Sequence, residues 1–260
     1  MVLVRTAHAG AQALSEALPI IDGMLRIALM ALLFASTLAA AAQPRIYFGH
    51  QSVGANILQG IKELGAPLSI KDEFLPENGE PLRKLENFAK AVGEGSHYDI
   101  ALMKFCYVDI DADTDVQALF TRYRATIAEL QAKNPRTTFV HVTLPLTTAQ
   151  TGPKALVKRL LGRAPYGTIE NVRRAEYNSL LRRTYGGREP IFDLARIEST
   201  APDGTVATVT WNGSTVPAMA AAYTDDGGHL NAAGRTRAAR EFLAVLAAAA
   251  RPGQELALTR

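Results

Sequence analysis

The chain has 260 residues, of which 48% are hydrophobic and 20% charged, and a formal net charge of +3. This composition is ordinary for a globular protein that buries a sizeable core. The charge is too mild to indicate a nucleic-acid partner. Cys106 is the only cysteine, so an intramolecular disulfide is excluded, and a lone thiol is usually buried and inert.

The N-terminal segment carries the pattern of a leader and signal peptide, residues 1–42. An uninterrupted apolar run, Ile27–Ala35, follows a short basic start and precedes small residues that end at Ala42. This pattern predicts cleavage after Ala42 and a secreted or periplasmic protein. The run is shorter than the roughly 20 apolar residues of a membrane span. Residues 1–23 do not fit the signal-peptide pattern, so Met24 is a possible true start of the protein. The alternative to a signal peptide is a buried N-terminal helix made from residues 12–42.

Strand-like apolar runs alternate with helical patterns through the rest of the chain. The strands are expected at Arg45–Phe48, Leu68–Phe74, Asp99–Met103, Thr137–Leu144 and Pro190–Leu194. The helices are expected at Val53–Leu64, Leu82–Val92, Val116–Lys133, Thr168–Tyr185 and Asn231–Ala250. Such alternation predicts a parallel sheet covered by helices on both faces. No repeat or linker divides residues 43–260, so one domain is expected.

Two connections are longer than a crossover needs, and one of them is basic. Thr147–Thr168 contains a short helix, Lys154–Leu161, and Ser199–Thr224 is the second long loop. Long loops in compact domains tend to be lids or binding loops. Residues 151–188 hold nine basic and two acidic side chains, whereas residues 72–115 hold eleven acidic and four basic ones. These stretches are either solvated faces of opposite sign or, for the basic one, a rim that attracts an anionic polymer or membrane surface.

Two short motifs at opposite ends of the domain carry the chemistry. Ser52 follows the first expected strand and opens the first helix, where a serine is either a plain helix cap or an exposed nucleophile. His229 lies in a glycine-rich turn just before the last helix, three residues after Asp226. A carboxylate at that spacing can hold one ring nitrogen and leave the other to accept a proton from Ser52. Asp225 is a competing orienter, and the spacing favours Asp226.

These blocks together resemble the SGNH hydrolases, the GDSL esterase/lipase superfamily, over residues 45–250. The segment from Asp226 to Gly234 matches the late block of that superfamily, while the first block has His50-Gln51-Ser52 in place of Gly-Asp-Ser. The resemblance implies a three-layer α/β/α fold with a flavodoxin-like five-stranded parallel sheet in the order 2-1-3-4-5. It also implies a catalytic Ser52, His229 and Asp226. Ser52 and the residues after the third strand then flank the switch point where open sheets bind ligands.

The oxyanion hole is where the chain departs from the superfamily. Its backbone donors correspond to Ser52 and Gly79, but no asparagine follows the third strand, where the chain reads Lys104-Phe-Cys-Tyr-Val-Asp109. Losing one donor costs about 10²–10³-fold in rate. The open replacements are the Cys106 or Tyr107 backbone amide, the Tyr107 hydroxyl, and Asn56, one helical turn beyond Ser52.

The sequence therefore predicts a secreted serine esterase that hydrolyses carboxylic esters, with short acyl groups on carbohydrate as the expected substrate class. A non-catalytic carbohydrate-binding module and an acyltransferase remain alternatives. So does a basic lid made by Lys154, Lys158, Arg159 and Arg163 over an anionic substrate. No cofactor or metal is expected, although His50, Asp225, Asp226 and His229 have the side chains of a zinc site.

Overall fold

The computed structural model of the chain describes residues 43–252 except positions 76, 94 and 96, together with residues 254 and 256. The expected leader and signal peptide, residues 1–42, lie outside the described residues. The predicted cleavage site and the alternative start at Met24 therefore stay predictions.

Five parallel strands form one sheet in the order β2-β1-β3-β4-β5, as predicted. β1 pairs with both β2 and β3, in register from Ile46, and thus lies near the centre of the sheet. The strands are β1 (Ile46–His50), β2 (Ile70–Phe74), β3 (Ile100–Met103), β4 (Thr138–Val142) and β5 (Ile191–Phe192).

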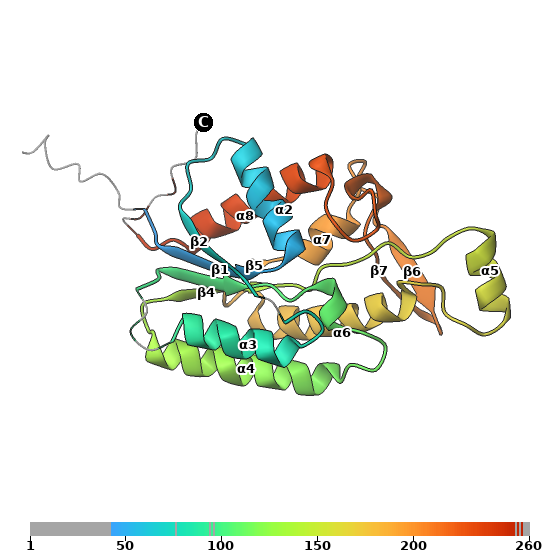
Figure 1. Cartoon of the computed structure of the whole chain (residues 1–260), viewed down its shortest axis with the longest axis horizontal. Coiled ribbons are helices and arrows are strands. Elements are labelled where there is room, and N and C mark those ends of the chain that lie inside the picture. Colours follow the sequence, from blue (N-terminus) through green and yellow to red (C-terminus); the bar gives the residue numbers. More distant parts are fainter. Residues whose placement is uncertain are drawn as a thin grey trace, which may run out of the picture. The chain divides into compact units, whose positions relative to one another are not determined.

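Helices cover both faces of this sheet (Figure 1). They are α2 (Ser52–Glu63), α3 (Pro81–Ala91), α4 (Val116–Lys133), α5 (Pro153–Leu160), α6 (Thr168–Tyr185), α7 (Leu194–Ser199) and α8 (Ala232–Ala249). The layer of α2, α7 and α8 lies on one face, and α3, α4 and α6 lie on the other. The three-layer α/β/α architecture is thus confirmed. Within the described residues, no helix is long and apolar enough to cross a membrane.

The sheet separates two hydrophobic cores because successive strand side chains point to opposite faces. In β1, Ile46 and Phe48 face α2 and α8, whereas Tyr47 faces α3. In β3, Leu102 and Met103 divide in the same way. Both cores consist of fully buried aliphatic and aromatic side chains, so the central strands are fixed from both sides and their carboxyl ends are held in place.

Part of the second long loop is regular structure that was not predicted. Strands β6 (Thr208–Trp211) and β7 (Ser214–Pro217) form an antiparallel hairpin. Asn212 and Gly213 both adopt positive φ, of 47° and 79°, in the two-residue turn between the strands. An Asn-Gly pair is the strongest short signal for such a turn because both residues tolerate positive φ.

Candidate active site

Ser52 stands at the N-terminus of α2, two residues beyond β1. The N-cap, Gln51, makes no side-chain capping bond, and the first backbone bond of the helix runs from the Ala55 amide to the Gln51 carbonyl at 3.1 Å. Within the described part of the chain, the amides of Ser52, Val53 and Gly54 therefore have no acceptor. Unpaired amides at a helix N-terminus favour an anion. The serine hydroxyl thus lies beside donors that suit a developing negative charge.

Gly54, in the first turn of α2, is required because a side chain would not fit there and not because its backbone conformation is unusual. A Cβ atom on Gly54 would lie 2.3 Å from the Cβ of His50. Gly54 does not have a positive φ. Its lack of a side chain instead allows the helix to approach the end of β1 closely. Any side chain there would displace the segment that carries Ser52.

Ser52, His229 and Asp226 form one continuous hydrogen-bonded chain. The Ser52 Oγ lies 3.0 Å from His229 Nε2, and His229 Nδ1 lies 2.6 Å from Asp226 Oδ2. A carboxylate at Nδ1 favours the tautomer with its proton on that nitrogen, which leaves Nε2 free to accept the proton of the serine. The structure thus brings together the three side chains that the sequence analysis expected to serve as nucleophile, base and orienting acid.

The Asp226 carboxylate is held by backbone amides as well as by the imidazole. Its Oδ1 accepts hydrogen bonds from the amides of His229 at 2.8 Å and Gly228 at 2.9 Å. These bonds hold the pKa of Asp226 well below its usual range. The bond from the His229 amide has the largest effect, followed by the Gly228 amide and the imidazole. The carboxylate consequently stays ionised, and the 57% exposure of its side chain also favours the charged form.

The rest of the His229 turn, residues 224–230, is fixed by polar contacts. The hydroxyl of Thr224 accepts the Gly227 amide at 2.9 Å and donates to Asp226 Oδ1 at 3.2 Å. Gly227 has a positive φ of 91°, which glycine adopts most readily. Asp225, the competing orienter, instead accepts a bond from Asn231 Nδ2 at 3.3 Å. Asp226 is therefore the carboxylate that contacts the imidazole.

Tyr107 brings a second hydroxyl to the site. Its Oη lies 3.5 Å from His229 Nε2, and its ring meets the imidazole edge to face at a centroid distance of 5.7 Å. The guanidinium of Arg174 holds the backbone of this tyrosine by donating to its carbonyl at 2.8 and 3.2 Å. Burial, followed by the nearby Cys106 and Asp226, raises the pKa of Tyr107. Its hydroxyl therefore keeps its proton and can act as a donor.

Two of the expected oxyanion donors face a different partner. The Gly79 amide donates to Asp109 Oδ1 at 2.9 Å, and the Cys106 amide donates to Asp109 Oδ2 at 2.6 Å. The carboxylate also forms an ion pair at 2.7 Å with Lys84, and both side chains are fully buried. A buried carboxylate needs such donors to offset its lost hydration. Because it binds both amides, the assignment of Gly79 and Cys106 to the oxyanion hole is corrected.

Asn56 connects the two halves of the site through its side-chain oxygen. Its Oδ1 accepts a hydrogen bond at 3.1 Å from the amide of Leu230, the residue after His229. Within the described residues its Nδ2 has no partner. Asn56 thus joins α2 to the His229 turn through its Oδ1. If Asn56 is an oxyanion donor, the donating atom is Nδ2 of the same side chain.

The remaining sequence-based alternatives separate in space. The ring of His50 is buried and contacts the Gln51 carbonyl at 2.9 Å and Asp72 at 3.4 Å. No cluster of three or more His, Cys, Asp or Glu side chains suited to a metal occurs among the described residues. Cys106 is a buried free thiol. Polar residues that the sequence analysis did not single out, namely Lys84, Thr148 and Arg174, support the loops around the site.

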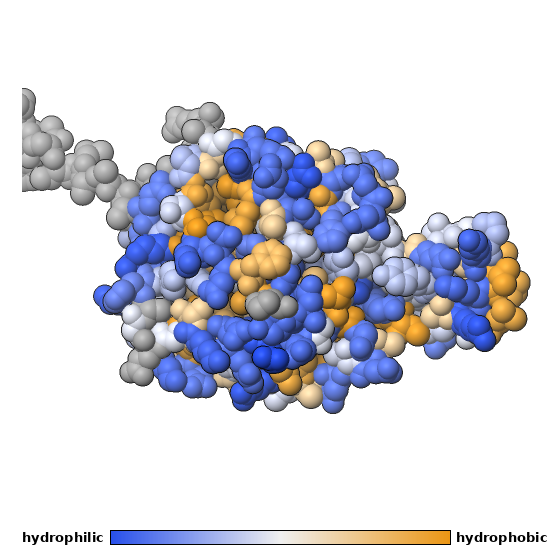
Figure 2. Space-filling model, viewed as in Figure 1, coloured by the Kyte–Doolittle hydropathy of each residue, from blue (hydrophilic) through white to orange (hydrophobic). Residues whose placement is uncertain are grey.

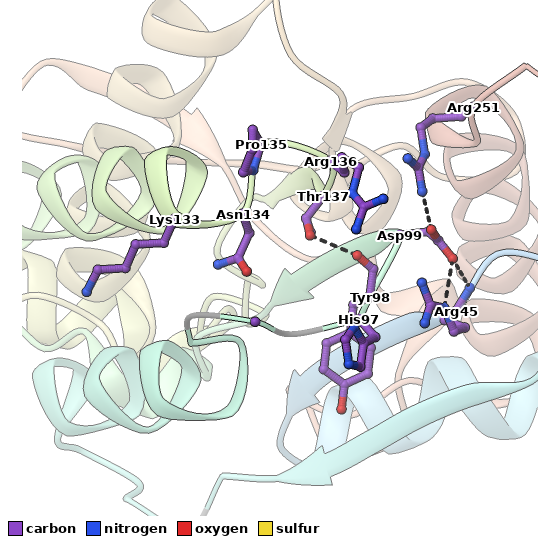
Figure 3. A pocket seen from close by; sticks show the side chains of 11 residues that line it. Arg45, His97, Tyr98, Asp99, Lys133, Asn134, Pro135, Arg136, Thr137 and Arg251 are labelled. Carbon is purple, nitrogen blue, oxygen red and sulfur yellow. Dashed lines mark hydrogen bonds and ion pairs between the residues drawn. The ribbon is translucent and has the colours of Figure 1, made fainter.

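A separate pocket lies at the opposite edge of the sheet, where the strands begin (Figure 3). Asp99 is one of the residues that line it and pairs with Arg45 at 3.3 Å and with Arg251. Thr137 donates to the carbonyl of Tyr98 at 2.8 Å in the same wall. These contacts fasten the amino ends of the strands together, far along the sheet from Ser52, and the pocket holds none of the three residues of the hydrogen-bonded chain.

Comparison with known proteins places the fold. No model of a known protein family matches the chain, and no curated protein is significantly similar in sequence. One similar solved structure is a protein assigned as a platelet activating factor from Streptococcus pneumonia, with 15% identity and a TM-score of 0.52 over 88% of this chain and 97% of that chain. Another is the acetyl xylan esterase AlAXEase, with 13% identity and a TM-score of 0.50 over 78% of this chain and 99% of that chain. The chain therefore has the fold that its resemblance to the SGNH hydrolases implied.

Proposed function

We propose that the chain is a serine hydrolase that cleaves carboxylic esters through Ser52, His229 and Asp226. The observation that carries the proposal is the unbroken path from Asp226 Oδ2 to His229 Nδ1, at 2.6 Å, and from His229 Nε2 to Ser52 Oγ, at 3.0 Å. Both distances lie within the range for proton transfer between a nucleophile, its base and the orienting group. The fold and the two sequence motifs support the same class of chemistry.

The first half-reaction acylates the serine. Ser52 Oγ attacks the carbonyl carbon while His229 Nε2 takes the hydroxyl proton, and the carbonyl electron pair moves onto the oxygen. When the ester C–O bond breaks, Nε2 returns the proton to the leaving alkoxide and the acyl group stays on Ser52. Asp226 remains ionised throughout, because its pKa is held low by the His229 and Gly228 amides, and stabilises the imidazolium.

The second half-reaction releases the acid. A water molecule attacks the carbonyl carbon of the acyl-enzyme while His229 Nε2 takes one of its protons. As the bond between this carbon and Ser52 Oγ breaks, Nε2 gives the proton to Oγ and the carboxylic acid is released. The side chain of His229 is 40% exposed, so water reaches the base directly. This access allows hydrolysis of the acyl-enzyme, and the intact proton path favours catalysis over simple carbohydrate binding.

The developing oxyanion needs donors that are free in the resting site. The Ser52 amide at the start of α2 is one, since no acceptor among the described residues occupies it. The Tyr107 hydroxyl is the second, because its contact with His229 Nε2 is long, at 3.5 Å, and an oxyanion can take its place as the acceptor. A protonated phenol pointing at the reaction centre can replace the amide of an asparagine as a neutral donor. We assign the oxyanion to these two groups.

The substrate class follows from the openness of the site and from the fold. Exposed His229 and Asp226 side chains indicate a shallow site for a small acyl group on a bulky or polymeric alcohol. A similar solved structure is an acetyl xylan esterase, which agrees with acetyl groups on carbohydrate. The signal-peptide pattern in residues 1–42 adds that the enzyme acts after export.

Turnover of p-nitrophenyl acetate by the purified chain tests the proposal. We expect hydrolysis that falls by at least about 10³-fold in Ser52→Ala. Ser214→Ala, an exposed serine on β7 far along the chain, is the matched control and should keep the activity. Equal turnover by Ser52→Ala and the unsubstituted chain would overturn the proposal. Slow hydrolysis with fast turnover on addition of an alcohol would identify a transferase instead.

A further inference from the structure

The basic connection between β4 and α6 forms an arm, residues 151–165, that contains α5. In Figure 1, α5 stands apart from the helices that cover the sheet. The arm is closed at its base by two bonds between Gln150 and Tyr166, from the Gln150 amide to the Tyr166 carbonyl at 2.9 Å and from the Tyr166 amide to Gln150 Oε1 at 3.3 Å. These bonds hold the two ends of the arm together, and α5 lies away from them at the outer part of the arm.

The polarity of α5 is the reverse of that of a helix packed on a globular protein. Ala155 is its only buried residue, with 4% exposure. At 100° per residue, the side of the helix opposite Ala155 carries Leu156, Val157 and Leu160. These side chains are 59%, 54% and 78% exposed, and the adjoining Leu161 is 66% exposed. Figure 2 shows this apolar surface at the outer end of the arm. A surface helix normally turns its apolar face to the core.

Basic side chains border the apolar face. Lys154 and Lys158 lie on one side of it and Arg159 on the other, with Arg163 just beyond the helix. No acidic residue occurs between Thr147 and Thr168. An exposed apolar stripe with cationic edges matches a surface that is apolar within and anionic at its boundary, because the long basic side chains reach the charged layer while the leucines enter the apolar one.

We infer that the arm is a docking element for an anionic lipid bilayer. A second copy of the chain is a weaker partner, since a stable interface buries about 800 Å² per partner and α5 is only two turns long. Like charges would also face one another in such a dimer. A bilayer with anionic headgroups satisfies both halves of the pattern, with each basic side chain near the surface adding about 1 kcal/mol, or roughly fivefold, to binding.

The base of the arm is tied to the candidate active site. The Thr148 amide donates to the carbonyl of Gly227 at 2.9 Å, two residues before His229. A bilayer bound by α5 would therefore tether the His229 turn to the lipid surface through this connection and bring Ser52 to the compartment where membrane-borne esters occur. This consequence rests on the proposed function, whereas the docking itself does not.

Cosedimentation of the full chain with phospholipid vesicles tests the inference. We expect binding to vesicles that contain phosphatidylglycerol, little binding to pure phosphatidylcholine vesicles, and weakening with added salt. Two variants should each lower the partition coefficient at least about tenfold: Leu156→Ser/Leu160→Ser, and Lys154→Gln/Arg159→Gln/Arg163→Gln. The matched controls change exposed residues elsewhere: Leu82→Ser/Val206→Ser, and Lys62→Gln/Lys90→Gln/Arg136→Gln.

Several outcomes would overturn the inference. Arm variants that bind as well as their controls would place the lipid contact elsewhere. Loss of binding in the charge variant alone would show a purely electrostatic surface, and a concentration-dependent dimer abolished by the leucine variant would show self-association. Thermal unfolding of each variant confirms that it is folded. Ser52→Ala should bind vesicles like the unsubstituted chain, so failure of the docking and failure of the proposed esterase are told apart.

Discussion

Asp226 and Asp109 each accept hydrogen bonds from two backbone amides, but the two carboxylates have different surroundings and different roles. Asp226 binds the amides of Gly228 and His229 and uses its second oxygen for the imidazole. Asp109 binds the amides of Gly79 and Cys106 and pairs with Lys84. The side chain of Asp226 is 57% exposed, whereas that of Asp109 is fully buried.

The two carboxylates show how similar hydrogen bonds give one side of the candidate site its proposed catalytic role and the other side a structural one. On the His229 side, the amides fix an ionised carboxylate whose remaining oxygen is available to a base. On the Asp109 side, the carboxylate takes up the amides that the family resemblance assigned to an oxyanion, and a buried lysine neutralises its charge. In the proposed mechanism, activation of a substrate carbonyl is thereby left to the N-terminus of α2 and to Tyr107.

The largest effect is expected at the exposed aspartate. In Asp226→Asn the amide would donate to Nδ1 and favour the tautomer that carries its proton on Nε2, so His229 cannot accept the Ser52 proton. We predict that kcat/KM for p-nitrophenyl acetate falls by about 10³–10⁴-fold. Asp225→Asn, its neighbour bonded to Asn231, is the control and should change the rate little. Equal losses in the two variants would break the assignment.

The buried aspartate should instead respond in stability. Lys84→Met leaves the Asp109 carboxylate buried without its cation, and we predict a loss of about 3–5 kcal/mol in the free energy of unfolding. Denaturant unfolding measures it, with Lys90→Met, an exposed lysine on the same helix, as the control. Adding Asp109→Asn to Lys84→Met should recover part of the loss. A loss under about 1 kcal/mol would mean that the pair behaves like a surface ion pair.

Tyr107 tests whether the oxyanion donors really differ from the family pattern. Tyr107→Phe removes the hydroxyl and keeps the ring against His229, so kcat should fall by about 10²–10³-fold with little change in KM. Tyr98→Phe, in the pocket at the opposite edge of the sheet, is the matched control. Unchanged kcat in Tyr107→Phe would return the role to Asn56 or to another amide of α2.

A third acid, Glu198, is buried like Asp109 but forms no ion pair within the described part of the chain. Glu198 accepts the Leu146 amide at 2.6 Å with one oxygen, while the other has no partner within the described part of the chain. Burial raises its pKa to about 8. The folded state therefore holds a proton that the unfolded state loses above its ordinary pKa, and stability is lost as pH rises from about 4.5 toward 8.

Glu198→Gln cannot titrate and keeps an oxygen for the Leu146 amide. Its stability relative to the unsubstituted chain should rise with pH across this window, by at most about 1.4 kcal/mol per pH unit. Urea unfolding at a series of pH values measures the difference, and Glu241→Gln, on the outer side of α8, is the control. A stability difference that is flat with pH would show that Glu198 is ionised in the folded protein.

Much of the fold could be predicted because it depends on local patterns. The bounds of α4 and α6 are those expected from the sequence, and the strand order follows from strand-helix alternation and the resemblance. The β6–β7 hairpin was missed although Asn212-Gly213 signals its turn. Its strands are only four residues long, too short for alternation to stand out.

The site was predictable where its residues are neighbours in the chain or, as for Ser52 and His229, where the family resemblance pairs them. Asp226 and His229 are three positions apart, so their contact follows from a single turn. The oxyanion side depends on Gly79, Lys84 and Asp109, which long-range packing brings together. No local pattern shows that a carboxylate thirty positions away will take an amide, so the assignment of Gly79 could be corrected only in three dimensions.

Covalent labelling with a fluorophosphonate, read by intact mass and peptide mapping, tests most directly whether Ser52 is a nucleophile activated by His229 and Asp226. We predict one adduct per chain, located on Ser52, formed rapidly by the unsubstituted protein and at least about 10³-fold more slowly by Asp226→Asn. A folded protein that forms no adduct, or that is labelled equally well at another residue after Ser52→Ala, would contradict this prediction.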